Sequence, residues 1–453
     1  MLDKIFKLKE NKTNILTELI AGITIFISLS YIIFINPAIL SQTGMDYNAV
    51  YTATIITSII GTLIMGLVAN VPYVQSAGLG INALFTYTIC GTLGFTWQQA
   101  LAMVFICGII NLFITATSIR KKLIKAIPIF LQDAITVGIG LFITFTGFRN
   151  ANFLEYSISN ISNGIATSSS VIPSLSNFNN PTIILALIGL IITTILVLKK
   201  IKGAYLIGII LTTLIGIPLK VTPLPDFSNY TFLPSIKPTL FKLDFAGLFT
   251  AKGSFIVIFM TIFTLCISDI FDTLGTFIGT GKKSGIFKLD EKGNMPKKLE
   301  KALFADCIAT SVGACLGTSN VTSYAESSAG IEAGGRTGLT AVFAALCFAL
   351  SLFIYPIIAC VPLSAISPVL ILIGVSMMGS VKSIDWEDIS IAIPAFFTII
   401  IMPFSYSITM GIEIGFLFYI ISNFVNGKAK EVSPMIYFFS ILFIIDFIYK
   451  ALA

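Results

Sequence analysis

Long apolar runs follow one another along most of this chain, separated by short polar or basic connections. The run from Ala21 to Leu40, AGITIFISLSYIIFINPAIL, carries no charged side chain. A helix needs roughly 20 apolar residues to cross the hydrocarbon core of a bilayer. Only 11% of the 453 residues are charged and 56% are hydrophobic, whereas about a quarter are charged in soluble domains. The pattern predicts an all-α polytopic membrane protein, and the length accommodates about 14 spans.

Two stretches interrupt the apolar pattern. Residues 70–90 contain Pro72, Gly78 and Gly80, and residues 317–336, GTSNVTSYAESSAGIEAGGR, are rich in hydroxyls, glycine and carboxylates. Both are too broken for a plain spanning helix, so we expect a short extended segment that leads into a half-helix in each. Irregular backbone at membrane depth is tolerated only where protein buries it or where it lines a cavity. These stretches are therefore the first candidates for a functional site.

The two broken stretches occupy matching places in two halves of the chain. Gly317 and Gly78 are 317 − 78 = 239 residues apart, which is close to the separation between the first spans of the two halves. An internal duplication of roughly 240 residues would give this offset. Seven spans per half is an odd number, so the second copy must lie inverted. We therefore expect a 7+7 inverted repeat with broken third and tenth spans.

Basic residues form short clusters between the apolar runs, and they indicate topology and not a nucleic-acid partner. With these clusters on one side of the membrane, both termini and Lys282–Lys301 are cytoplasmic, and Asn150–Asn180 is external. The first apolar run is too long for a cleavable signal peptide. The seven cysteines show no CxxC spacing and the chain has no histidine, so we expect neither a metal site nor a cofactor.

Few ionisable side chains lie well inside the apolar segments, where they are costly and mark function by default. Asp269 and Asp272 lie three residues apart in CISDIFDTLGTFIGTG. On a helix they share one face, which Thr273 continues. One of the two could instead bond a neighbouring helix. Asp306 and Glu413 are left open between helix packing and coupling.

Glu326 follows the break in the second half, near the start of the expected half-helix. There its carboxylate gains from the helix dipole, and unpaired N–H groups can meet a ligand; a capping role is the alternative. Asn320 and Ser323 lie nearby, and Asn82 is the matching polar residue of the first half. Carboxylates and amides at opposed half-helices suit a flat ligand with several N–H groups and carbonyls. The residues predict a secondary transporter for a polar, neutral solute.

At these positions the chain resembles a known family. The motifs AGLGINALF, SDIFDTLGTFIGTG and GTSNVTSYAESSAGIEAGGRTGLTA are similar to the signatures of the AzgA-like purine permeases. These belong to the nucleobase:cation symporter superfamily, which includes the uracil and xanthine permeases. The resemblance covers residues 14–427. It implies a plasma-membrane protein that imports hypoxanthine, guanine or adenine by proton symport, with a core domain that binds the base and moves like an elevator against a gate domain.

The resemblance also implies residue roles and domain boundaries. By motif position, Asp269 and Glu326 match the acids that hold the base, Asn82 matches a polar residue of the third span, and Asp272 matches a supporting acid. The expected divisions are a cytoplasmic N-terminus (1–13), the core (14–126 and 252–360), the gate (127–219 and 361–425), an external connection (220–251) and a C-terminal cytoplasmic or peripheral segment (426–453). Whether residues 435–449 span the bilayer is left open, and so is a homodimer.

These considerations give one set of expected site residues. The substrate-binding residues are Asp269, Glu326, Asn82, Asn320, Thr273 and Ser323, and the proton-coupling residues are Asp269, Asp272 and Glu326. Without histidine the proton must travel on a carboxylate, and Asp269 is the first choice because it lies near the middle of an apolar run and shares a face with Asp272. Sodium is the alternative coupling ion.

Three alternative functions compete with purine uptake. A uracil or xanthine permease would share the motifs. An anion exchanger or channel could share the fold, although paired carboxylates are unsuited to an anion. A membrane enzyme has little support, because the sequence shows no serine–base pair and no metal-ligand cluster.

Overall fold

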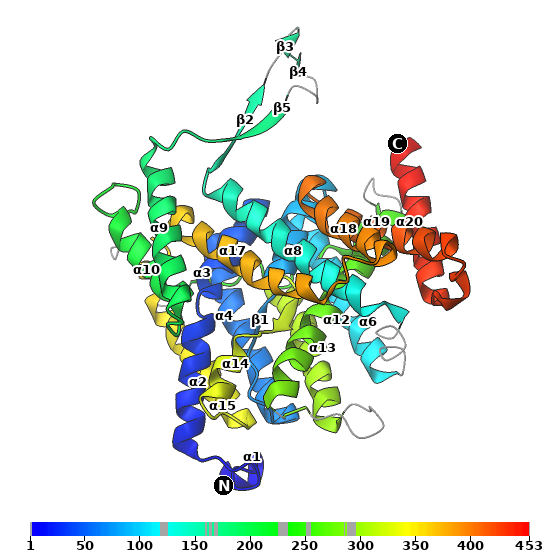
Figure 1. Ribbon diagram of the computed structural model, residues 1–453. Helices are drawn as coiled ribbons and strands as arrows, with labels where there is room; N and C mark the ends of the chain where they lie inside the picture. The colour runs from blue at the N-terminus through cyan, green and yellow to red at the C-terminus, as the bar shows by residue number, and fades with distance from the viewer. Residues whose placement is uncertain are drawn as a thin grey trace.

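The computed structural model describes residues 2–117, 126–158, 161–162, 165–166, 171–224, 234–250, 255–284, 286–287 and 296–452. Parts of three expected segments lie outside the described residues. They are the basic residues at 120–125, residues 285 and 288–295 of the expected cytoplasmic segment Lys282–Lys301, and residues 225–233 of the expected external connection. The described chain is mainly helical (Figure 1), as the apolar runs predict.

The first half of the chain is a series of apolar helices with one short buried strand among them, and a hairpin of further strands lies between Leu154 and Leu175 (Figure 1). Its elements are α1 (Leu2–Phe6), α2 (Ile15–Leu29), α3 (Ile32–Leu40), η1 (Ser41–Thr43), α4 (Tyr47–Ile64), η2 (Met65–Ala69), β1 (Gln75–Ala77), α5 (Leu79–Ala83), η3 (Leu84–Thr92), α6 (Trp97–Ala116), α8 (Ile129–Asn150), α9 (Pro181–Leu198) and α10 (Ala204–Gly216). Polar caps begin several helices: Asn14 caps α2, Asp46 caps α4, and Thr96 forms a capping box with Gln99 at α6. Such caps satisfy N–H groups that the helix itself leaves without partners.

The second half repeats this order of long helices around one short strand. Its elements are α11 (Phe245–Thr250), α12 (Phe255–Ser284), α13 (Lys297–Leu316), β6 (Val321–Ser323), α14 (Ser327–Glu332), α15 (Gly338–Ser351), η5 (Leu352–Ile354), α16 (Tyr355–Ile358), α17 (Leu363–Met377), η6 (Met378–Ser383), α18 (Ile389–Phe404), α19 (Ile408–Val425), η7 (Ala429–Glu431) and α20 (Pro434–Leu452). Eight helices of the described chain are long and apolar enough to cross a membrane, judged by length and composition. A helical multi-pass membrane protein is therefore confirmed, and the count of 14 spans stays a prediction.

The two broken stretches meet through a pair of short strands. β1 and β6 pair antiparallel, with Gln75 opposite Ser323, and every residue of both strands is buried. Beyond the strands, the Gly78 N–H donates to the Asn320 carbonyl at 2.9 Å. Backbone groups away from water must find partners within the protein, and the two strands supply partners for each other. The expected extended segments are present, each followed by a short helix.

The helices pack in two groups. In the first group, α2, α4 and α6 pack against α13 and α15 around the strand pair; in the second, α8 and α9 pack against α17, and α8 and α19 pack against α18. The groups touch where α5 meets α8 and where α3 meets α17. Small residues allow the closest approaches, because a Cβ on Gly338 would overlap the Gly66 carbonyl oxygen. Small residues at helix contacts are typical of membrane proteins.

Two further features mark the ends of the molecule. The polar segment after α8 forms a hairpin of β2 (Leu154–Ile158) with β5 (Val171–Leu175), with β3 (Ile161–Ser162) and β4 (Ile165–Ala166) at its tip. This hairpin projects from the end opposite to α1 (Figure 1). The C-terminal α20 packs against α12 and α19, where the Phe439 ring stacks on Phe263 with centroids 3.8 Å apart. The run 435–449 is therefore part of a continuous helix, and its relation to the bilayer stays open.

Candidate functional site

The candidate site lies where β6 ends and α14 begins. Glu326 is the residue directly before α14, and the Tyr31 hydroxyl donates a hydrogen bond to its Oε1 atom. Tyr31 comes from the short break between α2 and α3 and is almost completely buried. Two interruptions of helical structure, far apart in the sequence, thus face each other. The N-terminus of a helix favours negative charge, so the position of Glu326 suits a carboxylate.

Asp272 of α12 belongs to the same group. Its carboxylate interacts with the Thr322 side chain and, electrostatically, with Glu326. Asp272 and Ala325 keep exposed surface, although Thr322 is buried. A charged group among apolar helices requires water or a polar partner beside it. Asp272 and Ala325 therefore keep accessible surface near the end of the strand pair, and Glu326 is half-buried beside them.

Tyrosine side chains supply the aromatic part of the site. The rings of Tyr31 and Tyr205 meet edge to face, with centroids 5.4 Å apart. The Tyr324 hydroxyl donates to the Ala77 carbonyl and so ties the start of α14 to β1. Because Tyr205 comes from α10, which packs with α9 and α17, the site lies at the boundary between the two helix groups. Aromatic faces beside carboxylates suit a flat ligand with N–H donors.

Asp269 lies in a different environment from Asp272. It is buried, and its Oδ2 atom accepts a hydrogen bond of 2.8 Å from Asn111 Nδ2 on α6. Its charge also interacts with the neighbouring Cys107 thiol. The structure thus brings Asp272 to Glu326, and it places Asp269 against α6. The two acids were expected to share one helix face, but they interact with different residues.

Asn82 and Asn320 form hydrogen bonds beside the strand pair, and Asn320 bonds Cys107, the thiol that also interacts with Asp269. Asn82 Oδ1 accepts from the Ser319 hydroxyl, and Asn320 Nδ2 donates to Cys107 Sγ at 3.3 Å. Both amides are completely buried. Their contacts join the two broken stretches to each other and to α6, whereas neither contacts Glu326.

Thr273 and Ser323 converge on Asp306 of α13. The Thr273 hydroxyl donates to Asp306 Oδ2 at 2.7 Å, and the Ser323 hydroxyl donates to Oδ1 at 3.2 Å. Gln75 Nε2 of β1 donates to the same Oδ1 at 2.9 Å. Asp306 therefore holds α12, α13 and both strands together, and a carboxylate with several such partners can remain buried. Of the expected site residues, Asp272 and Glu326 are the two acids that interact with each other.

The sequence patterns did not identify Tyr205. Tyr205 lies within an apolar run, where a tyrosine gives no separate signal, and its partners lie far along the chain. Within the described residues, no group of three or more histidine, cysteine or acidic side chains is placed to hold a metal ion.

The fold and the site define a class of protein, namely a membrane transporter in which two broken segments meet at a central polar site. The transmembrane domain of the cyanobacterial bicarbonate transporter BicA has the same fold, with a TM-score of 0.60 over 90% of this chain and 96% of that domain. The two sequences are 14% identical, so this likeness concerns the fold alone.

Sequence relatives identify the family. Residues 16–414 match the profile of the permease family Xan_ur_permease. The guanine/hypoxanthine permease PbuO of Bacillus subtilis is 40% identical over 97% of this chain and 99% of its own length. The adenine permease AdeP of Escherichia coli is 36% identical over 99% of this chain and 96% of its own. The chain belongs to the xanthine/uracil permease family.

Proposed function

We propose that the protein imports purine nucleobases across the plasma membrane by proton symport. The main support is the convergence of Glu326, Asp272 and Tyr31 at one site, in a chain whose relatives are named for guanine, hypoxanthine and adenine. A purine is flat, which suits contact with tyrosine rings. Its ring N–H groups suit carboxylate acceptors.

In this proposal the two interacting acids, Glu326 and Asp272, have different roles. Glu326 accepts N–H groups of the base, and Tyr31 orients that carboxylate through its hydrogen bond. Asp272 carries the proton, because two neighbouring carboxylates favour a proton on one of them. Asp269, the first choice from the sequence, becomes a positioning residue through Asn111. Asn82, Asn320, Thr273 and Ser323 hold the strand pair in place.

The proposed movement is an elevator-like displacement of a core, residues 14–126 and 252–360, against a gate, residues 127–219 and 361–425. The two packing groups of helices support this division. The contact between them is close, since a Cβ on Gly80 of α5 would lie 2.7 Å from Ile139 Cγ2 of α8. Both termini are proposed to be cytoplasmic, and a base bound beside Tyr205 would lie at the sliding boundary.

Uptake of radiolabelled hypoxanthine by cells that lack their own purine transport tests this function. We expect Glu326→Gln to lower uptake about 10- to 100-fold at equal surface expression, because a charge-assisted hydrogen bond contributes about 1.5–3 kcal/mol. Glu332→Gln is the matched control, since Glu332 ends the same short helix and is exposed. Unchanged uptake in the Glu326 variant would contradict the assignment of the site.

A further inference from the structure

Tyr205 is a residue of the proposed gate that reaches the acids of the proposed core. It is the second residue of α10, and its ring meets the Tyr31 ring edge to face with centroids 5.4 Å apart. Its side chain also interacts electrostatically with Glu326. The start of α10 fits closely against α2, because a Cβ on Gly203 would overlap Ile27 Cγ2. Tyr205 is therefore held beside the break between α2 and α3.

The gate also orients the Tyr205 side chain. This side chain interacts with that of Ser376 near the end of α17, another helix of the gate. The Ser376 hydroxyl donates to the Ile373 carbonyl at 2.6 Å, so its oxygen can accept from the tyrosine hydroxyl. Tyr205 is half-buried and Ser376 is exposed. The ring is thus fixed by the gate and still keeps accessible surface.

In the proposed orientation, Tyr205 lies near the cytoplasmic end of the gate. The three lysines of residues 199–202 come directly before α10 and are exposed, and Lys382 follows α17. Basic residues are enriched on the cytoplasmic side of membrane proteins. Because Glu326 interacts with Tyr205, the acids of the core lie beside the cytoplasmic end of the gate in this structure.

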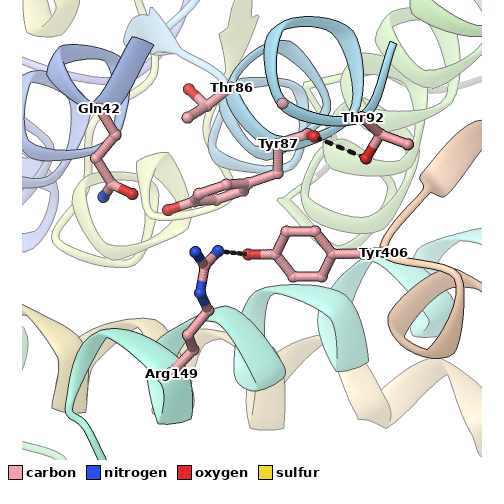
Figure 2. A pocket seen from close by; sticks show the side chains of 7 residues that line it. Gln42, Thr86, Tyr87, Thr92, Arg149 and Tyr406 are labelled. Carbon is pink, nitrogen blue, oxygen red and sulfur yellow. Dashed lines mark hydrogen bonds between the residues drawn. The ribbon is translucent and has the colours of Figure 1, made fainter. Parts of the chain in front are cut away.

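At the other end of the boundary, different side chains join the core to the gate. A cavity of about 500 Å³ lies there, at the end of α8 from which the β-hairpin continues, and Figure 2 shows its lining side chains. Tyr87 of the core meets Tyr406 of the gate with ring centroids 5.4 Å apart, and Asn150 Nδ2 of the gate donates to the Tyr87 hydroxyl at 3.4 Å. Neither Tyr205 nor Glu326 lines this cavity. The core and the gate are therefore in contact at the outer end while the acids lie toward the cytoplasm.

We propose that Tyr205 positions the base only when the core faces the cytoplasm; this rests on the proposed purine transport. A tyrosine ring can contact the flat face of a purine, and this ring belongs to the part against which the core moves. When the core carries Glu326 and the base toward the outside, Tyr205 stays with the gate. The contact therefore strengthens binding on the cytoplasmic side alone and sets how readily the base is released into the cell.

Hypoxanthine exchange in membrane vesicles of opposite orientation tests this role. Right-side-out vesicles present the outer face to radiolabelled hypoxanthine, inverted vesicles present the cytoplasmic face, and both are preloaded with the unlabelled base at equal pH. We expect Tyr205→Leu to raise KM about five- to tenfold in inverted vesicles, because the base loses an aromatic contact. In right-side-out vesicles KM should change less than about twofold. A purely structural role would change both faces alike.

Conservative variants separate the ring from its hydroxyl. Tyr205→Phe keeps the ring and Ser376→Ala removes the partner of the hydroxyl, so each should raise the cytoplasmic KM only about two- to threefold. The double variant should add little to either single one, since both remove the same interaction. Tyr419→Leu is the matched control, because Tyr419 is a half-buried tyrosine of the gate whose ring lies 5.8 Å from that of Phe130; it should leave KM unchanged on both faces.

Two results would overturn the role of Tyr205. One is an equal rise in KM on both faces for Tyr205→Leu. The other is an unchanged KM on the cytoplasmic face, either for Tyr205→Leu or, if that variant does not fold, for both Tyr205→Phe and Ser376→Ala. Failure of the proposed transport function would show separately, as absence of hypoxanthine exchange by the unmodified protein in both kinds of vesicle.

Discussion

Replacing Glu18 by alanine would test how α2 and α15 are held together beside the site. Glu18 is completely buried in α2 and accepts five hydrogen bonds from the start of α15. Its Oε1 accepts from Arg336 N at 3.0 Å, and its Oε2 accepts from N and Oγ1 of Thr337 at 3.3 and 2.8 Å and from those of Thr340 at 3.0 and 2.6 Å. The carboxylate also complements the dipole at the N-terminus of α15.

The cost of this substitution follows from the groups left behind. Alanine would remove the acceptor of three backbone N–H groups and two hydroxyls. The hydroxyls can turn to other acceptors, whereas the N–H groups are fixed, and each buried donor without a partner costs about 1–3 kcal/mol. After local relaxation we expect a loss of about 3–5 kcal/mol, the range found when one partner of a buried charged group is removed.

Thermal unfolding of the detergent-solubilised protein, followed by size-exclusion chromatography after heating, would measure this loss. We expect a midpoint lower by about 3–5 °C, and a smaller decrease for Glu18→Gln, which keeps one acceptor oxygen. Glu10→Ala is the matched control, because Glu10 makes an exposed ion pair of 3.1 Å with Lys7, and such pairs contribute about 0–1 kcal/mol. Equal midpoints for Glu18→Ala and Glu10→Ala would refute the reasoning.

Three other predictions use the same structure. Gly338→Ala should lower the thermal midpoint strongly, because its Cβ would overlap the Gly66 carbonyl, whereas Gly379→Ala, with nothing within 4 Å, should not; equal midpoints would argue against the close contact of α15 with η2. Asp272→Asn should abolish hypoxanthine uptake, and Asp269→Asn should retain part of it; the opposite order would restore Asp269 as the central acid. A cysteine at Ser174 in the hairpin should react with an impermeant thiol reagent in intact cells, and one at Lys298 should not; labelling at Lys298 from outside would contradict the proposed orientation.

The main architecture could be predicted because its causes are local. Proline, glycine and hydroxyl-bearing residues interrupt otherwise apolar runs at 70–90 and 317–336, and the same two places hold β1 and β6. Backbone groups there must find partners within the protein, which favours a short extended segment at each break. Their pairing with each other required the three-dimensional arrangement.

The composition of the site could be predicted only in part, because small angular differences decide partners. Residues three apart on a helix differ in direction by about 60°, which is enough to turn Asp272 toward Thr322 and Asp269 toward Asn111. In β6, successive residues face opposite sides, so Thr322 interacts with Asp272 while Ser323 donates to Asp306.

Long-range partners were beyond sequence patterns. Tyr31 and Glu326 are separated by 295 positions, and Glu18 and Thr340 by 322. Nothing in the local sequence around either pair indicates its partner.

Purified protein reconstituted into liposomes would test the central proposal most directly, with radiolabelled hypoxanthine outside and an imposed pH gradient that is alkaline inside. We expect the base to accumulate above its external concentration, the accumulation to collapse when a protonophore is added, and the Glu326→Gln protein to take up the base about 10- to 100-fold more slowly. Accumulation that ignores the protonophore and follows an imposed sodium gradient would contradict proton symport.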